Sequence, residues 1–263
     1  MREWLEYSAF VGCDKLTSVS VPSGVRNLEY KVFKEVTNIT QFYYDRFFIY
    51  GDNEERILLN SSKTKLIGYP NKFSKAHYKI PKSIKIIGEN AFSNSNNLLK
   101  IKIHKNVMEI GSNAFSQCTS LIFIEVEEEN LKYSSIDGVL FNKEKTELIF
   151  YPPGRKELSY IIPSGVKAIV SDAFYRCVSL ARVTIPDTLS NISNYAFSEN
   201  TSLEEIIVEN GNSEYSSAEG VLFNKQKTKL IRCPARTNET DYIVPKSVEH
   251  IGRFAFNNCK NIS

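Results

Sequence analysis

The chain has 263 residues, of which 42% are hydrophobic and 24% are charged, and its formal net charge is +3. This length allows a large core to be buried, and so small a positive charge gives no argument for binding nucleic acid. No run of about 18 apolar residues is present and residues 1–7 lack an apolar leader segment, so we expect neither a transmembrane segment nor a signal peptide within this chain.

The dominant feature is a tandem repeat of 82 residues. The dipeptide Ala-Phe recurs at this spacing, at residues 9–10, 91–92, 173–174 and 255–256. A second series of phenylalanines keeps the same step, 23 residues after the first series, at Phe33, Phe115 and Phe197. Repeats of this kind decide the fold, because each unit buries its apolar face only against its neighbours. The sequence therefore predicts an 82-residue super-repeat.

Residues 42–50 of the first copy contain six aromatic side chains. In the 82-residue register, Phe42 and Tyr44 correspond to Ile124 and Val126 and are expected in the core, whereas Tyr43 faces outward. The stretch is open to two interpretations, an exposed patch for a partner or core filling in a divergent copy.

A shorter unit lies inside each copy. Leu98-x-x-Ile101-x-Ile103 returns 23 residues later as Leu121-x-x-Ile124-x-Val126, which is a leucine-rich-repeat pattern. The alternation predicts a strand whose apolar residues face inward, with Lys100 and Lys102 facing outward. Stacked coils of this kind form a solenoid.

Each copy also carries a predicted β-hairpin. In the second copy, the apolar residues 139–141 and 148–150 flank the polar residues 142–146, and the third copy repeats this pattern from residue 212 to residue 234. Spacing alone leaves open whether the hairpin arms join the main sheet or protrude from it.

Four strings resemble the BspA-like leucine-rich repeats, namely residues 80–84, 87–92, 137–143 and 173–180. Repeats of that family occur in surface proteins of anaerobic bacteria and of mucosal parasitic protists. The resemblance implies a curved, right-handed solenoid with strands on its concave side and a role in adhesion to host cells or matrix proteins. It implies no catalytic residues. The departure from the pattern lies in residues 41–56, which lack the Tyr-Ser-Ser…Asp-Gly sequence of the later copies.

The expected fold is thus a β-rich leucine-rich-repeat solenoid, with short helical turns on the convex side and inserted β-hairpins. We expect one such domain over residues 1–263. Both ends, at residues 4–5 and 259–263, fall in the middle of a coil without a polar cap. This suggests a piece of a longer protein, and self-association through the uncapped ends is a further expectation.

The cysteines and histidines give no sign of a metal or catalytic site. Cys13, Cys177 and Cys259 share one repeat position, and Cys118 occupies the matching position of the other coil. Equivalent positions one copy apart should be about 20 Å apart, beyond the ~7 Å limit for a disulfide, so we expect buried thiols in tight turns. The three histidines, His77, His104 and His250, occupy three different repeat positions. We expect no enzyme, cofactor or metal, although a hidden carboxylate pair is left open.

The charges are unevenly distributed along the chain. Residues 63–105 contain ten lysines and one acid, Glu89, whereas residues 199–219 contain six glutamates and no lysine or arginine. The lysine-rich part is either a polyanion site, for example for a sulfated glycan, or a solvated face.

The outward strand positions form a ladder across the predicted coils. Aromatic and arginine side chains of this kind anchor protein interfaces. The candidate binding residues are Tyr43, Lys79, Lys100, Lys102, Phe123, Glu125, Arg182 and Thr184. Three apolar members of the ladder, Phe123, Ile161 and Ile207, have no core reason to face outward, unless the hairpins cover them.

Three functions remain. The first is a protein-binding or adhesion module of a cell-surface or secreted protein, which recognises host or matrix protein through the concave face. The second is an intracellular, cytoplasmic scaffold that uses the same surfaces. The third is a polyanion binder that acts through residues 63–105, with salt-sensitive affinity.

Overall fold

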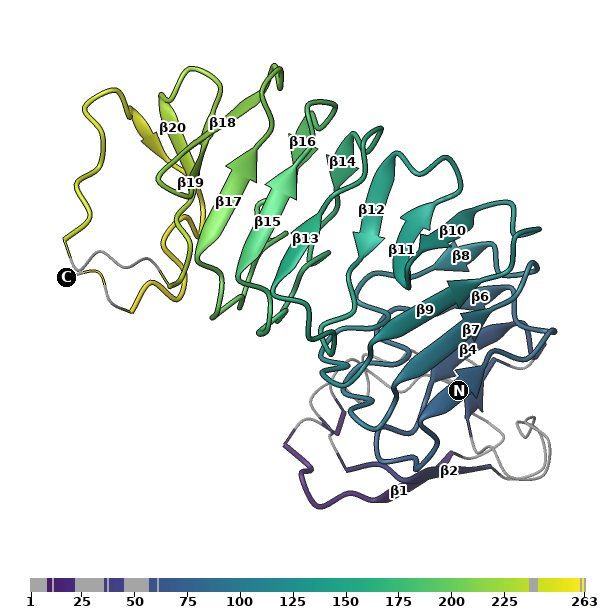
Figure 1. Cartoon of the computed structure of the whole chain (residues 1–263). Coiled ribbons are helices and arrows are strands. Elements are labelled where there is room, and N and C mark those ends of the chain that lie inside the picture. Colours follow the sequence, from purple (N-terminus) through teal and green to yellow (C-terminus); the bar gives the residue numbers. More distant parts are fainter. Residues whose placement is uncertain are drawn as a thin grey trace, which may run out of the picture. The chain divides into compact units, whose positions relative to one another are not determined.

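The computed structural model describes residues 9–10, 12–21, 36, 38–44, 57–60, 62–236, 241–260 and 262, and for residues 21 and 41–44 it describes only the backbone. The chain divides into two compact units, Met1–Ser134 and Ser135–Ser263, which are treated separately below (Figure 1). The single domain expected over residues 1–263 stays a prediction.

The described part of unit 1 contains three sheets. A short parallel pair consists of β1 (Ser18–Val21) and β2 (Gln41–Tyr44). A parallel three-stranded sheet contains β5 (His77–Lys79), β7 (Lys100–Ile103) and β9 (Phe123–Val126). A four-stranded sheet contains, in order, β3 (Leu58–Leu59), β4 (Lys65–Gly68), β6 (Ile86–Ile87) and β8 (Glu109–Ile110).

Unit 2 repeats this plan. Its parallel three-stranded sheet contains β13 (Ser159–Ile161), β15 (Arg182–Ile185) and β17 (Glu205–Val208). A second sheet contains β11 (Val139–Asn142), β12 (Glu147–Phe150), β14 (Ala168–Ile169) and β16 (Asn191–Ile192). A third contains β18 (Tyr215–Ala218), β19 (Val221–Asn224), β20 (Lys229–Arg232) and β21 (His250–Ile251). One strand, β10 (Tyr133–Ile136), runs across the division between the units.

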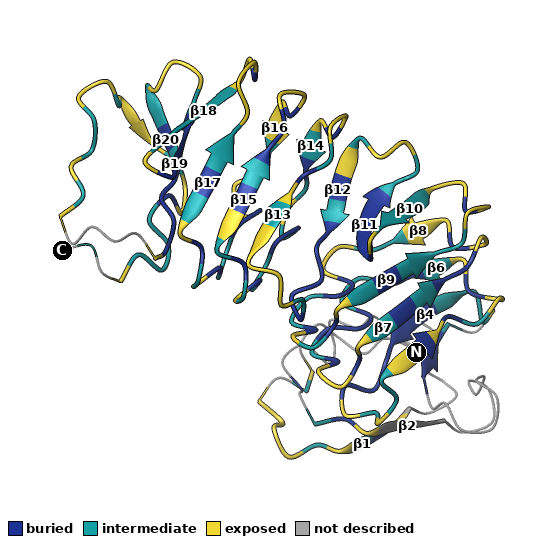
Figure 2. Ribbon diagram, viewed as in Figure 1, coloured by how far each residue is buried: buried dark blue, intermediate teal, exposed yellow. Residues whose placement is uncertain are grey.

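The parallel register shows that each unit is a β-solenoid built from 23-residue coils. In unit 1, Ile101 of β7 pairs with Ile124 of β9, and both side chains are fully buried, whereas Lys100 and Lys102 on the same strand stay partly exposed. Figure 2 shows the same alternation along β15 of unit 2. The predicted coil is therefore confirmed. The unit visible in the strand pairing is the single coil, and the 82-residue period stays a property of the sequence.

Stacked aromatic rings run through the core of each unit. In unit 1, the ring of Phe92 lies 5.1 Å from Tyr69 and 5.6 Å from Phe115, measured between centroids. In unit 2, Phe174 lies 5.3 Å from Tyr151 and 5.2 Å from Phe197. Both phenylalanine series of the sequence repeat thus meet in one stack, which fixes how neighbouring coils sit on each other.

The predicted short helical turns are wrong for the described residues, where no helix occurs. In their place, Asn90 and Asn94 adopt left-handed φ angles of 55° and 63°, which interrupt an α-helix within four residues. The backbone amides between these two residues alternate between a carbonyl of the same turn and a carbonyl of the next coil. The amide of Ser93 bonds back to Asn90 O at 2.9 Å, and that of Phe92 bonds to Ala114 O of the next coil at 2.8 Å. The turns therefore use half of their hydrogen bonds to join coils.

The predicted hairpins are confirmed, and their second arms join a sheet. In unit 2, β11 and β12 are antiparallel, with Phe141 opposite Leu148, and β12 then pairs in parallel with β14. The same arrangement joins β3, β4 and β6 in unit 1, and β19, β20 and β21 in unit 2. Each hairpin therefore supplies strands to the second sheet of a coil stack rather than to a three-stranded sheet.

Candidate binding surface

The outward side of the β5–β7–β9 sheet brings six side chains of four chemical types together in unit 1. They alternate along the strands with buried residues such as Tyr78 and Ile101. Strand register makes them neighbours across the sheet. We call this set the unit 1 face: His77, Lys79, Lys100, Lys102, Phe123 and Glu125.

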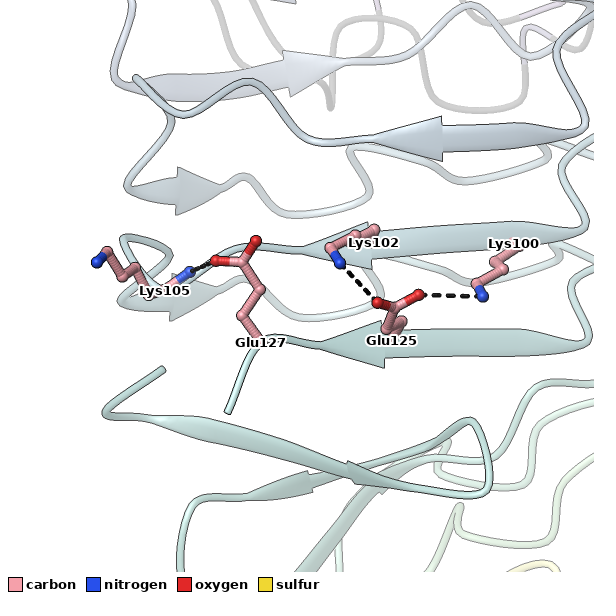
Figure 3. A network of polar contacts seen from close by, with 5 residues as sticks. All are labelled: Lys100, Lys102, Lys105, Glu125 and Glu127. Carbon is pink, nitrogen blue, oxygen red and sulfur yellow. Dashed lines mark hydrogen bonds and ion pairs between the residues drawn. The ribbon is translucent and has the colours of Figure 1, made fainter. Parts of the chain in front are cut away.

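Glu125 lies at the centre of an ion-pair network on the unit 1 face (Figure 3). Its Oε1 is 2.6 Å from Lys102 Nζ and its Oε2 is 3.0 Å from Lys100 Nζ. The hydrogen bond from Lys102 and the second one from Lys100 hold the pKa of Glu125 below its usual value, and the same contact with Glu125 raises the pKa of Lys102. Each carboxylate oxygen of Glu125 pairs with one lysine, so this residue orients both long lysine side chains.

Phe123 is half-buried on the unit 1 face because a lysine covers it. The Nζ of Lys100 lies 4.7 Å from the centroid of the Phe123 ring, within the range of a cation–π contact. Lys100 thus contacts both the carboxylate of Glu125 and the ring of Phe123. The face thus presents an aromatic ring on the edge strand β9, beside Lys100 of β7 and on the same strand as Glu125.

Two further groups lie at the end of β7. Glu127 accepts a hydrogen bond from the backbone amide of Lys105 at 3.1 Å, and the Lys105 side chain points away from the Glu125 network (Figure 3). His104 is buried, with its Nε2 2.8 Å from Pro81 O and its Nδ1 accepting a hydrogen bond from Asn106 N at 3.1 Å. Both ring nitrogens of His104 are thus engaged in structural contacts.

The corresponding sheet of unit 2 carries a second, smaller set. Arg182 Nε lies 2.6 Å from Glu205 Oε2 across the β15–β17 pair. Thr184 lies between Ile161 and Ile207 in the register, and Ile161 is 67% exposed. We call this set the unit 2 face: Ile161, Arg182, Thr184, Glu205 and Ile207.

A hairpin flanks only one edge of the unit 2 face. The amide of Ile206 bonds to Gly220 O at 2.9 Å, and that of Val208 bonds to Ser217 Oγ at 3.0 Å, so the β18–β19 hairpin lies along β17. Ile207 is half-buried there. The β18–β19 hairpin thus partly covers Ile207, whereas Ile161 on β13 stays exposed.

Seven of the eight candidate binding residues have described side chains. Five lie together on the unit 1 face, namely Lys79, Lys100, Lys102, Phe123 and Glu125, and two lie on the unit 2 face, namely Arg182 and Thr184. The side chain of Tyr43 is outside the described residues, as is most of the aromatic stretch 42–50. Sequence reasoning missed His77, although the two-residue period of β5 and its pairing with Lys100 place it on the same face.

The lysines of residues 63–105 do not all lie on one sheet. Lys79, Lys100 and Lys102 belong to the β5–β7–β9 sheet, whereas Lys65 belongs to β4 and Lys85 directly precedes β6 in the other sheet. A ligand on the unit 1 face therefore meets only a minority of this lysine-rich segment.

Cys118 and Cys177 are buried in turns, as predicted. Cys118 Sγ contacts Phe92 O at 2.9 Å, and burial raises the pKa of Cys118 to about 12 and raises that of Cys177 as well. The prediction is wrong for Cys13, which is exposed, and Cys259 is only half-buried. The described part of the chain contains no group of three or more His, Cys, Asp or Glu side chains suited to a metal ion. Nor does that part contain a helix long and apolar enough to cross a membrane.

Several solved structures share this fold. The pneumococcal vaccine antigen PcpA is 24% identical, with a TM-score of 0.58, and the match covers 94% of this chain and 61% of PcpA. A leucine-rich cell surface protein from Faecalibacterium prausnitzii is 21% identical, with a TM-score of 0.56 and coverage of 94% of this chain and 72% of that one. A leucine-rich repeat protein from Eubacterium ventriosum is 24% identical with a TM-score of 0.49, and 76% of this chain matches 52% of it. This chain thus spans less than two thirds of the length of PcpA and of the Eubacterium protein.

A comparison with curated proteins gives no match. The family model described as the BspA type leucine rich repeat region matches six copies, over residues 3–76, 69–160, 155–240 and 232–263. The matched segments cover nearly the whole chain and include the coils that the strand register defines. The chain therefore belongs to the BspA-type leucine-rich-repeat family.

Proposed function

We propose that this chain is a non-enzymatic protein-binding module of a cell-surface or secreted protein, and that it recognises a host-cell or extracellular-matrix protein. The unit 1 face is the main contact surface, and the unit 2 face is a second, separate contact surface. In this proposal the three-stranded sheet of each unit forms the concave side of that unit's own right-handed coil stack.

The single observation that carries the proposal is the shared arrangement of Lys100, Phe123 and Glu125. A hydrophobic ring lies beside a lysine that a carboxylate already holds in place, at 3.0 Å. Ordering a long side chain on binding costs about 0.5–1.5 kcal/mol, so side chains that are ordered beforehand lower the cost of association. Protein interfaces also combine apolar groups, aromatic rings among them, with polar and charged neighbours.

Two of the structural relatives support a location at the cell surface. One is described as a vaccine antigen and the other as a cell surface protein. Those descriptions concern the relatives, and they support the location proposed for this chain without naming its partner. An intracellular scaffold that uses the same faces is the alternative location.

A second candidate function is binding of a polyanion such as a sulfated glycan. It is favoured by Lys79, Lys100 and Lys102, which outnumber the one carboxylate of the unit 1 face. It is disfavoured because Glu125 already neutralises part of this charge and because the other lysines of residues 63–105 lie outside this sheet, in β4 or in turns and connecting segments. A polyanion-binding face would bind heparin-like material with an affinity that falls steeply as the salt concentration rises. An apolar contact with a protein would depend on salt only weakly.

The location is tested by labelling intact cells that carry the native protein with a membrane-impermeant amine reagent. We expect the full-length protein to be labelled together with a known surface protein, while a cytosolic control stays unlabelled. If the protein stays unlabelled while both controls behave as expected, the result would contradict a surface module and support the intracellular scaffold. Purified matrix proteins are then screened for binding to the immobilised chain, with heparin at several salt concentrations as the polyanion arm.

A further inference from the structure

Two cysteines of unit 2 lie in direct contact on neighbouring coils. Cys233 follows β20, and Cys259 lies 26 residues later, in the turn that follows β21. The Sγ of Cys259 is 3.6 Å from Cys233 O and 3.5 Å from Pro234 O. A backbone hydrogen bond of 2.7 Å from Cys233 N to Ala255 O holds the coils together at this point.

The same contact recurs elsewhere in the chain without a second thiol. Cys118 faces Phe92 O and Cys177 faces Tyr151 O, each across the same separation of 26 residues. The residue opposite the thiol is therefore aromatic in those coils and is a cysteine only at position 233. Because the backbone geometry is shared, Cys118 and Cys177 serve as internal comparisons for Cys259.

The surroundings of Cys259 differ from those of the other two thiols in charge and in exposure. The buried guanidinium of Arg232 donates hydrogen bonds to Phe254 O at 2.8 Å and Asn257 O at 3.1 Å, in the same turn. The hydrogen bond from Cys233 and the positive charge of Arg232 lower the pKa of Cys259. Cys259 is also partly exposed, whereas Cys233 is completely buried.

We propose that Cys233 and Cys259 form a reversible intramolecular disulfide by exchange with a small-molecule disulfide such as oxidised glutathione. The Cys259 thiolate attacks one sulfur of that disulfide, breaks its S–S bond and releases one glutathione thiolate, which takes up a proton. The Cys233 thiol then loses its proton and attacks the Cys259 sulfur, which releases the second glutathione. Two protein thiols are oxidised and one small disulfide is reduced to two thiols. The product joins the coil of β20 covalently to that of β21.

The test uses the full chain carrying Cys13→Ser, which removes the exposed thiol and leaves four of the five cysteines. The folded protein is equilibrated with mixtures of oxidised and reduced glutathione, quenched with a maleimide and analysed by intact mass and peptide mapping. We expect the loss of two thiols, a decrease of about 2 Da before labelling with no glutathione adduct, and one peptide that links Cys233 to Cys259. Reduction with dithiothreitol should restore four labelled thiols.

Three further variants separate this exchange from general oxidation. Cys118→Ser should form the same link, Cys259→Ser should form none, and Cys233→Ser should retain one glutathione on Cys259. The proposal is overturned if the linked peptide is absent, if it appears only in urea, or if the Cys13→Ser protein retains glutathione on Cys259 beside a free Cys233. The peptide map of the Cys13→Ser protein tests the proposed disulfide even if one of the further variants fails to fold.

Discussion

At the scale of single residues, a buried asparagine holds the chain where each three-stranded sheet gives way to a hairpin. The Nδ2 of Asn130 donates to two backbone carbonyls of the preceding coil, at 3.0 and 2.9 Å. Its Oδ1 accepts hydrogen bonds from two amides that follow it, both at 2.8 Å. Asn212 makes the same four contacts 82 residues later. One side chain thus satisfies four backbone groups.

Replacement of this asparagine should be costly. Asn130→Ala leaves buried carbonyls and amides without partners, so we expect the free energy of unfolding to fall by roughly 2–4 kcal/mol. The matched control is Asn106→Ala, because Asn106 is exposed and its Nδ2 donates to one carbonyl at 3.1 Å, and its effect should stay below about 1 kcal/mol. Urea unfolding of the full chain measures both, and equal losses for the two variants would contradict the role given to Asn130.

The ion-pair network of the unit 1 face predicts a pH dependence. The folded pKa of Glu125 is lowered, so its contribution to stability is present above its ordinary value of 4.5 and is lost as the pH falls through the lower, folded value. In an NMR titration we expect the Glu125 midpoint to lie below 4.5 and to rise in Lys102→Met.

The control for this titration is Lys105→Met, which removes the same charge from a side chain that points away from Glu125 (Figure 3). It should leave the Glu125 midpoint nearly unchanged. A midpoint that is the same in wild type and Lys102→Met would show that the ion pair does not form in solution.

At the scale of elements, three hairpin turns place a lysine in the left-handed region, at the same position of each copy. The φ angles of Lys63, Lys145 and Lys227 are 59°, 58° and 55°. In the second copy, Asn142 Oδ1 closes the turn by accepting hydrogen bonds from Thr146 N and Glu147 N, at 2.8 and 3.0 Å. The side-chain closure holds the lysine in a conformation that a non-glycine residue disfavours.

Glycine at this turn position should therefore stabilise the hairpin. A left-handed L-residue costs about 1–2 kcal/mol, and the greater freedom of glycine in the unfolded chain offsets about 0.5–1 kcal/mol of this, so Lys145→Gly should raise stability by roughly 0.5–1 kcal/mol. The control is Glu144→Gly in the same turn, where φ is not positive and glycine should lower stability. Thermal unfolding compares the two, and a loss in both would contradict the assignment of strain to Lys145.

Strands and hairpins were predictable because each carries a local pattern. The alternation in Ile101-Lys102-Ile103 predicts one strand, and two apolar runs around a polar turn predict a hairpin. The turns after Gly88 were not predictable in this way, because their conformation depends on left-handed residues such as Asn90 and on hydrogen bonds to a coil 23 residues away. The two-residue strands β6 and β8 are too short to show any period.

At the scale of the whole molecule, the repeat register predicted which residues of the candidate site face outward, and it could not predict how they pair. Lys100 and Glu125 were both on the predicted ladder, but their contact depends on side-chain rotamers that the spacing does not determine. The Cys233–Cys259 contact was missed for a different reason. It joins two different repeat positions that are 26 residues apart, whereas the sequence analysis compared cysteines at equivalent repeat positions.

The central claim is that this chain binds protein through the unit 1 face. The measurement that tests it most directly is the affinity of a folded face variant for a matrix protein obtained from the binding screen. The face variant is Lys100→Ala/Phe123→Ala/Glu125→Ala, and the control is Lys85→Ala/Met108→Ala/Glu109→Ala. The control removes the same mixture of one lysine, one apolar residue and one glutamate from exposed positions at the beginning of β6 and β8, away from the unit 1 face.

We expect the dissociation constant of the face variant to rise at least about tenfold, which corresponds to about 1.4 kcal/mol, while the control binds as the wild type does. Circular dichroism spectra that match the wild type would show that both variants are folded. Wild-type affinity in a folded face variant, or an equal loss in the control, would contradict binding through the unit 1 face.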